Sequence, residues 1–143
     1  MITVRQLMRA KGPDVWHIAP DACVYDALRL MADKEVGSLL VLEGDELVGI
    51  ISERDYARKV ILKDKSSLDT PVREIMTQQV ISVSPEQSIQ DCMALMTHKR
   101  VRHLPVLEDG RLVGIISIGD VVKAIISQQE FMIEQLERYI EGG

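Results

Sequence analysis

A nine-residue phrase that occurs twice constrains this chain more than any other feature. Leu47–Asp55 reads LVGIISERD and Leu112–Asp120 reads LVGIISIGD, at an offset of 65 residues. In both copies an apolar run with an internal glycine ends in serine, and an aspartate follows three positions later. Because self-similarity at a fixed period marks repeated supersecondary units, the sequence predicts two copies of one folding unit.

The match between the two halves extends beyond this phrase. From Val15 onward the halves align at the same offset, whereas Val4–Met8 aligns with Val72–Met76 at an offset of 68, because the first copy carries three extra residues around Lys11–Asp14. A polar stretch without periodicity separates the copies. We therefore predict a first unit over residues 1–62, a linker over 63–70, a second unit over 71–127 and a C-terminal helical extension over 128–143.

Each copy has the same order of hydrophobic patterns. In the first copy a short strand over Val15–Ile18 precedes a helix over Val24–Met31, whose apolar residues recur at i, i+3, i+4 and i+7. The continuous apolar run Leu39–Leu42 predicts a buried strand. After a polar turn, Leu47–Ile51 returns beside it, and Ser52 begins a second helix.

The second copy repeats this order with a strand over Val80–Val83, an apolar helix face over Ile89–Met96 and a hairpin turn at Asp109–Gly110. Its last helix runs from about Ile118 to Tyr139. The predicted fold class is α/β (α+β), with two β-α-β-β-α units packed about a pseudo-twofold axis. One such unit buries too little surface to be secure alone, and two related clefts are expected where the copies meet.

Helix starts carry their own signals. Thr3–Gln6 and Ser88–Asp91 have the spacing of a capping box, which Cys23 weakens at the corresponding start in the first copy. The second helix of the first copy is expected to have Tyr56, Val60 and Ile61 on its apolar side.

The composition excludes several classes of function. A net charge of −5 and a pI near 5.2 argue against a general nucleic-acid or anionic-membrane binder. No apolar run approaches the length of a membrane span. The beginning of the sequence has no signal-peptide apolar core, and we expect a cytoplasmic location.

The cysteines and histidines point to no metal or redox chemistry. Cys23 and Cys92 form no C-x-x-C pair, and we predict reduced thiols rather than a disulfide. His17, His98 and His103 lack the spacing of metal ligands, so we expect no metal ligated by protein groups.

Two motifs in register resemble a known family. Gly49–Asp55 (GIISERD) and Gly114–Asp120 (GIISIGD) follow the hairpins, and Val36–Val41 (VGSLLV) and Val101–Val106 (VRHLPV) precede them. The pattern is similar to the tandem CBS (cystathionine-β-synthase type) domain pair, or Bateman module, over residues 3 to about 124. The resemblance implies a non-catalytic regulatory module that binds an adenosine-containing ligand such as AMP, ADP, ATP, NAD or S-adenosylmethionine.

The resemblance also implies which residues bind. Asp120 and Asp55 would accept hydrogen bonds from both ribose hydroxyls. Ser117 and Ser52 would donate to a phosphate or ribose oxygen, beside the free N–H groups of a helix start. The same Ser-x-x-Asp spacing is also that of a capping box, which needs no ligand, so both interpretations stay open.

Basic residues are distributed unequally between the copies. Arg102 and His103 precede the second hairpin and resemble the family's basic pair that meets phosphate; solvated surface charge is the alternative. The first copy has a glycine and a serine there, so Arg54 or Arg58 would have to supply the positive charge. The two clefts are therefore expected to differ.

In the family, the adenine base meets the first strand of each unit. Here that points to Trp16, His17 and Ile18 in the first copy and to Val80 and Ile81 in the second. Trp16 either stacks on a base or packs as a partly buried side chain.

Two functions remain open on the sequence. One is an energy- or redox-sensing module that binds an adenine nucleotide and acts on an effector protein through a change of shape. The alternative is a ligand-free dimeric interaction or scaffold protein. No nucleophile–base pair, P-loop or metal cluster is present, which ranks an enzyme last. The apolar stripe within Phe131–Ile140 predicts a homodimer that uses this helix or the helices after each hairpin.

Overall fold

The computed structural model describes residues 2–12 and 14–142, which form two compact units. The N-terminal unit contains residues 14–81, and the C-terminal unit contains residues 82–142 together with residues 2–12. Residues 1, 13 and 143 of the predicted domains lie outside the described residues. The compact units differ from the sequence repeats because two helices are exchanged. The helix at residues 4–11, before the first repeat, packs in the C-terminal unit, and the helix at residues 72–75, before the second repeat, packs in the N-terminal unit.

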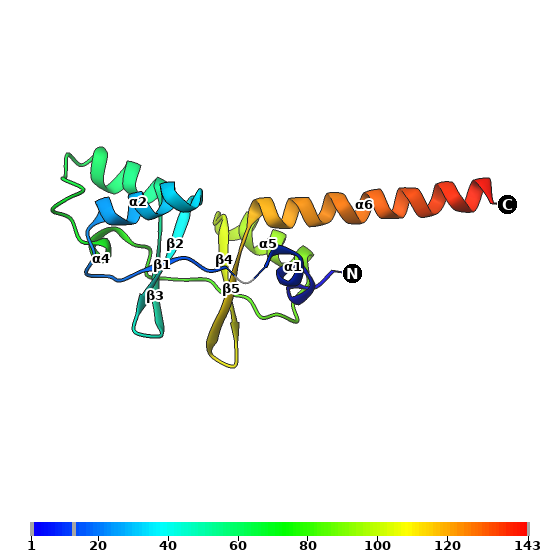
Figure 1. Cartoon of the computed structure of the whole chain (residues 1–143), viewed down its shortest axis with the longest axis horizontal. Helices are drawn as coiled ribbons and strands as arrows, with labels where there is room; N and C mark the ends of the chain where they lie inside the picture. Colours follow the sequence, from blue (N-terminus) through cyan, green and yellow to red (C-terminus); the bar gives the residue numbers. More distant parts are fainter. Residues whose placement is uncertain (1, 13, 143) are drawn as a thin grey trace. The chain divides into compact units, whose positions relative to one another are not determined.

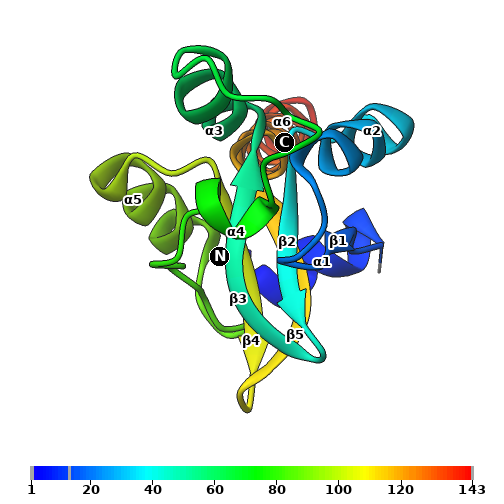
Figure 2. The same cartoon turned by 90° about the vertical axis from the view of Figure 1, so that its left-hand side faces the viewer.

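The N-terminal unit is built on a three-stranded sheet. Its strands are β1 (His17–Ile18), β2 (Ser38–Glu43) and β3 (Glu46–Ser52), in the order β1-β2-β3. β1 runs parallel to β2, and β3 runs antiparallel to it. The helices are α2 (Val24–Lys34), α3 (Glu53–Tyr56) with its continuation η1 (Ala57–Ile61), and α4 (Val72–Ile75), which lies against β3 (Figure 2). Apolar side chains of α2, β2, β3, η1 and α4 form one buried core.

The C-terminal unit has the same plan. It contains a hairpin of β4 (His103–Glu108) and β5 (Arg111–Ser117). The helix α5 (Ile89–Lys99) precedes this hairpin, and α6 (Ile118–Glu141) follows it. The unit is completed by α1 (Val4–Lys11), which comes from the dark-blue end of the chain and contacts α6 (Figure 1). The predicted hairpins, the helix over Ile89–Met96 and the long last helix are confirmed.

The strand predicted over Val80–Val83 is wrong except at its last residue. Val83 forms a single parallel bridge with Val106 beside β4. The Val80 N–H instead donates to the Gln78 carbonyl at 3.0 Å. This turn takes up the N–H that a longer strand would need.

The placement of Ile61 on an apolar helix side is also wrong, since Ile61 is 56% exposed whereas Val60 is fully buried. The helix that begins after Ser52 continues as the π-helical segment η1. Ile61 is the last residue of this segment, and its side chain lies at the surface.

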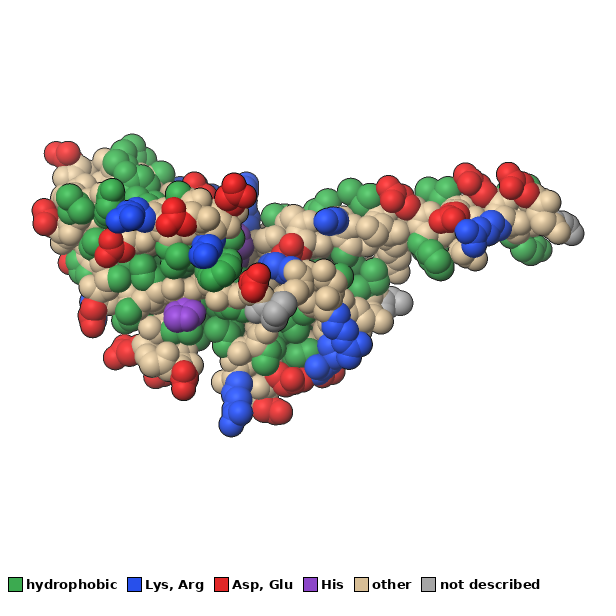
Figure 3. Space-filling model, in the orientation of Figure 1, with side chains coloured by type: hydrophobic (Ala, Val, Ile, Leu, Met, Phe, Trp, Pro, Cys, Tyr) green, Lys and Arg blue, Asp and Glu red, His purple; other side chains and the backbone are tan. Residues whose placement is uncertain are grey.

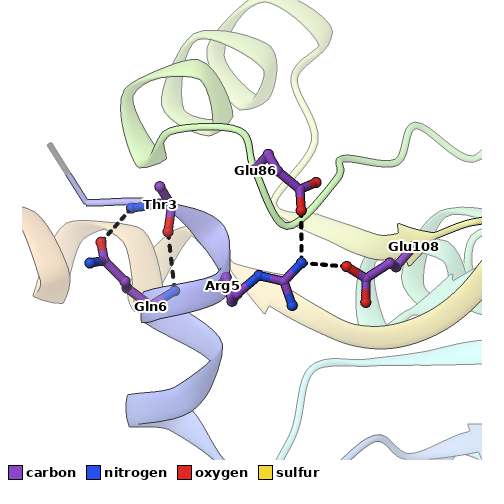
Figure 4. Close-up of polar contacts among 5 residues, drawn as sticks. All are labelled: Thr3, Arg5, Gln6, Glu86 and Glu108. Atoms are coloured by element: carbon purple, nitrogen blue, oxygen red, sulfur yellow. Dashed lines mark hydrogen bonds and ion pairs between the residues drawn. The ribbon is translucent and has the colours of Figure 1, made fainter.

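Both predicted capping boxes are confirmed. The Thr3 hydroxyl accepts a hydrogen bond from the Gln6 N–H, and the Gln6 side chain accepts one from the Thr3 N–H (Figure 4). Ser88 and Asp91 make the same pair of bonds at the start of α5. Cys23 makes no side-chain capping bond at the start of α2, as expected for a thiol.

α1 docks on the C-terminal unit through backbone hydrogen bonds and two buried side chains. The Val4 N–H donates to the Gln87 carbonyl at 2.8 Å, and the Arg5 N–H donates to the Pro85 carbonyl at 2.9 Å. Val4 is fully buried and Leu7 nearly so. These N–H groups belong to the first turn of a helix, which has no internal acceptors for them.

α4 docks on the N-terminal unit in the same way. The Val72 N–H donates to the Ala22 carbonyl at 2.8 Å, and the Arg73 N–H donates to the Pro20 carbonyl at 3.0 Å. Val72 and Ile75 are buried. The same contacts at equivalent residues show that the exchange belongs to the repeat itself and is not an accident of one copy.

An arginine of each exchanged helix adds an ion pair. The Arg5 guanidinium lies between Glu86, at 2.7 Å, and Glu108 (Figure 4). Arg73 pairs with Asp21 at the equivalent place in the N-terminal unit. Because these side chains are largely solvent-exposed, the pairs orient the helices more than they stabilise them.

The C-terminal half of α6 extends away from the rest of its unit (Figure 1). It exposes a stripe of apolar residues, Met132, Ile133, Leu136, Tyr139 and Ile140. Figure 3 shows green apolar patches along this helix. Phe131 is also exposed. Among the described residues, neither α6 nor any other helix has the length and apolar character needed to cross a membrane.

Neither Cys23 nor Cys92 is in a disulfide. Burial of Cys92, together with the nearby Asp91 carboxylate, raises the pKa of its thiol to about 11. Because the thiolate is the reactive form, Cys92 is an inert core residue at neutral pH.

Each exchanged helix presses a methionine against a glycine of the repeated phrase. A Cβ atom at Gly49 would lie 2.7 Å from the Met76 sulfur and 3.0 Å from the Thr77 carbonyl oxygen. A Cβ atom at Gly114 would lie 2.7 Å from the Met8 sulfur, with no backbone atom close to it. The close approach of these helices explains the glycine in both copies.

These contacts predict unequal effects of Gly49→Ala and Gly114→Ala. We expect Gly49→Ala to lower the free energy of unfolding by about 1–3 kcal/mol, because the backbone at Thr77 cannot move aside. Gly114→Ala should cost less, because the flexible Met8 side chain can rotate away. Urea unfolding of both variants measures the difference. An equal or larger loss in Gly114→Ala would contradict this account of how the exchanged helices pack.

Candidate ligand site at the start of α6

The turn from β5 into α6 holds the second copy of the Ser-x-x-Asp motif. The Ser117 N–H donates to Asp120 Oδ2 at 2.8 Å, and the Asp120 N–H donates to the Ser117 hydroxyl at 3.1 Å. This is a capping box, so the structural interpretation of the motif is confirmed. The geometry fixes the Asp120 carboxylate at the helix start, where backbone N–H groups favour negative charge.

A lysine from the exchanged helix completes this arrangement. Lys11, the last residue of α1, donates from Nζ to Asp120 Oδ2 and to the Ile115 carbonyl oxygen, each at 2.7 Å. The Lys11 and Asp120 side chains are 30% and 26% exposed. The carboxylate is therefore shared between a cap and an ion pair that solvent still reaches.

The predicted basic pair lies at the same end of the hairpin. His103 is paired with Ser117 in the register of β4 and β5. The Arg102 carbonyl accepts a hydrogen bond from the Ile118 N–H at 2.9 Å, which ties the start of α6 to the start of β4. The His103 side chain is partly buried, while Arg102 is exposed.

The charges of this cluster influence one another. Burial by itself would raise the pKa of Asp120, but the hydrogen bond from Lys11 and the bonds from Ser117 outweigh it and lower the pKa. Burial lowers the pKa of His103; Lys11 and Arg102 lower it further, and Asp120 acts in the opposite direction. Lys11 thus lies beside the Asp120 carboxylate, and Lys11, Arg102 and Asp120 all act on His103.

The first copy of the motif is also a capping box but has a different ion pair. Both the N–H and the hydroxyl of Ser52 donate to Asp55 Oδ2, at 3.0 and 3.1 Å. Lys59, one turn along the same helix, lies 3.1 Å from Asp55 Oδ1 and donates to the Ile75 carbonyl at 2.9 Å. The Asp55 side chain is only 12% exposed.

The other residues predicted for the first site, Trp16, His17 and Ile18, lie in β1 or directly before it. The Trp16 carbonyl accepts a hydrogen bond from the Leu40 N–H, and His17 and Ile18 pair with β2. Trp16 packs against the buried core, and the Lys34 ammonium lies 4.3 Å from its ring centroid. Trp16 thus packs against the core with a cation over its ring, and its stacking on a base stays a prediction.

Some predicted residues are not gathered into either cluster. Arg54 is exposed, and no described residue forms an ion pair with it. Val80 and Ile81 are partly buried at the end of the N-terminal unit. Their contact with adenine stays a prediction.

Sequence reasoning missed Lys11 and Lys59, which pair with the two aspartates. The i, i+4 spacing of Asp55 and Lys59 was a usable signal. Lys11 gave none, because it pairs with a residue more than a hundred positions away.

The comparisons with known proteins assign the family. The family model for the CBS domain matches residues 4–62 and 72–127, and this chain belongs to the CBS-domain family. Domains of this family generally bind adenosine-containing ligands, and stand-alone CBS-domain proteins are regulatory.

Three relatives illustrate the match. The CBS domain-containing protein CBSX3 of Arabidopsis thaliana, mitochondrial by name, is 40% identical over 99% of this chain and 73% of its own length. A protein with CBS domains from Burkholderia ambifaria MC40-6, assigned to signal transduction by name only, is 51% identical with a TM-score of 0.83, covering 88% of this chain and 93% of its own. A hexameric CBS-CP12 protein from bloom-forming cyanobacteria is 30% identical with a TM-score of 0.75, covering 85% of this chain and 70% of its own.

The charge cluster predicts opposite effects of two substitutions on one histidine. Lys11→Met removes a positive neighbour and should raise the pKa of His103, whereas Asp120→Asn removes a negative neighbour and should lower it. An NMR pH titration of the His103 ring resonances measures both. Lys99→Met, which removes an exposed lysine of α5, serves as the control and should leave His103 unchanged. Shifts of the same sign in the first two variants would mean that the cluster does not exist in solution.

Proposed function

We propose that this protein is a regulatory module that binds an adenine nucleotide through Asp120 of its C-terminal unit. The observation that carries the proposal is the state of the Asp120 carboxylate. Its Oδ2 is held by Ser117 and Lys11, whereas no residue among 2–12 and 14–142 donates a hydrogen bond to Oδ1. In the N-terminal unit both Asp55 oxygens are engaged and the side chain is less exposed.

The chemistry of an adenine nucleotide suits this cluster. An ionised carboxylate only accepts hydrogen bonds, and a ribose diol offers two adjacent donors. Arg102 and His103 are proposed to meet the phosphates, because a guanidinium forks onto phosphate oxygens and the ring adds a further donor. AMP, ADP, ATP and NAD all carry these groups. Contacts of adenine with Val80 and Ile81, or with Trp16, His17 and Ile18 in a second site, belong to this proposal.

The proposed output is a ligand-dependent change of shape that acts on an effector protein, without catalysis. The cytoplasm is the proposed location, although one relative is mitochondrial by name. The second candidate is a ligand-free scaffold, and the observation that favours it is that both Ser-x-x-Asp motifs are complete capping boxes.

A Ser–Asp capping box outside the repeated motif allows the two candidates to be separated. Ser88 and Asp91 make the same capping bonds at the start of α5, outside the repeated motif. Asp120→Asn and Asp91→Asn are therefore matched in chemistry. Thermal unfolding of the wild type and of both variants is measured with AMP, ADP, ATP, NAD, NADH and S-adenosylmethionine.

The proposal predicts a rise of several degrees in the wild-type midpoint for at least one ligand, since saturation at a hundredfold excess over the dissociation constant adds about 2.7 kcal/mol. Asp91→Asn should keep this rise, and Asp120→Asn should lose it while staying folded. A ligand effect that survives in Asp120→Asn would remove Asp120 from the site. No rise with any ligand would favour the scaffold.

We also propose that the α6 stripe pairs two copies of this chain. Its residues recur at i, i+1, i+4, i+7 and i+8 on one exposed helix face, a pattern that pairs helices in water. Light scattering should give twice the chain mass of 16.1 kDa. Leu136→Asp should reduce the mass to that of one chain, whereas Ser127→Asp, on the opposite side of α6, should not. A wild-type monomer would exclude this dimer.

A further inference from the structure

Lys11 is the one basic residue of the Asp120 cluster that comes from the exchanged helix. It holds two acceptors, Asp120 Oδ2 and the Ile115 carbonyl, and an ammonium has three donors. Its side chain is 30% exposed. A third N–H of Lys11 is therefore left to meet an incoming group beside the carboxylate.

The first copy of the motif has no such residue. The position equivalent to Lys11 at the offset of 68 is Gln79, which carries no charge. Asp55 is neutralised by Lys59 of its own helix, which is also bonded to the Ile75 carbonyl. Each aspartate thus has a lysine beside it, but only the lysine of the C-terminal unit comes from the exchanged helix.

The charge balance of the cluster is positive. Lys11 and Arg102 each carry a positive charge and Asp120 carries one negative charge, so an excess remains even with His103 neutral. A neutral nucleoside has no group that uses this excess, whereas a phosphate does. The chemistry beside Asp120 therefore favours a nucleotide, which carries a charged phosphate, over the corresponding uncharged nucleoside.

We propose that Lys11 determines the specificity of the Asp120 site by binding the 5′-phosphate of the nucleotide, so that the site selects AMP over adenosine. This inference rests on the proposed function, in which Asp120 binds the ribose. Lys11 keeps its bond to the carboxylate and offers its remaining N–H to a phosphate oxygen. The residue comes from α1, the helix that precedes the first copy of the repeat, and it serves the site of the second copy.

The test compares AMP and adenosine by isothermal titration with the full chain. We expect Lys11→Gln to weaken AMP binding by at least about 10-fold, the effect of losing one hydrogen bond between charged groups, and to change adenosine binding by less than about 2-fold. Lys11→Arg should restore most of the preference for AMP. Lys99→Gln, which removes an exposed lysine of the same unit, should change neither affinity.

The outcomes distinguish a failure of this inference from a failure of the proposed function on which it rests. If the wild type binds AMP and Lys11→Gln keeps the wild-type ratio of AMP to adenosine affinity, the role of Lys11 is overturned and the proposed function stands. Tighter AMP binding in Lys11→Gln would also overturn it, because Lys11 would then be a competitor for Asp120. If the wild type binds neither ligand nor any other nucleotide, both proposals fail. Circular dichroism of each variant verifies that it is folded.

Discussion

The structure depends on the exchange of one helix between the two repeats. The first turn of α1 and that of α4 have N–H groups without internal acceptors, and carbonyls beside α5 and α2 supply them. Val4 and Val72 are buried at these contacts, and burial of such side chains contributes about 1.5–3 kcal/mol each. Without its exchanged helix, each unit would lose part of its core as well as these bonds, so neither repeat is complete alone.

Much of the fold was readable from local signals. The repeated phrase gave the hairpins, the capping boxes at Thr3 and Ser88 gave two helix starts, and the apolar periodicity gave the length of α6. The exchange could not be predicted, because both repeats offer the same backbone acceptors. No local sequence pattern indicates on which repeat a helix docks. The π-helical segment η1 was also missed, since it arises from packing rather than from a residue type.

The candidate site was readable only in part. Ser117, Asp120 and His103 come together because the hairpin register and the helix start fix them, and these are local features. Lys11 joins them across more than a hundred residues through the exchange. A site assembled by a long-range contact leaves no spacing in the sequence, which is why the residue that most changes its charge was not predicted.

The two lysine–aspartate pairs have different dependence on the exchange. Asp55 and Lys59 belong to one helix, so their pair needs no other element, and only the bond of Lys59 to Ile75 reaches α4. Asp120 has its lysine only while α1 is docked. Under the proposed function, ligand binding at Asp120 would therefore be linked to the docking of α1, and each would alter the other by the same free energy.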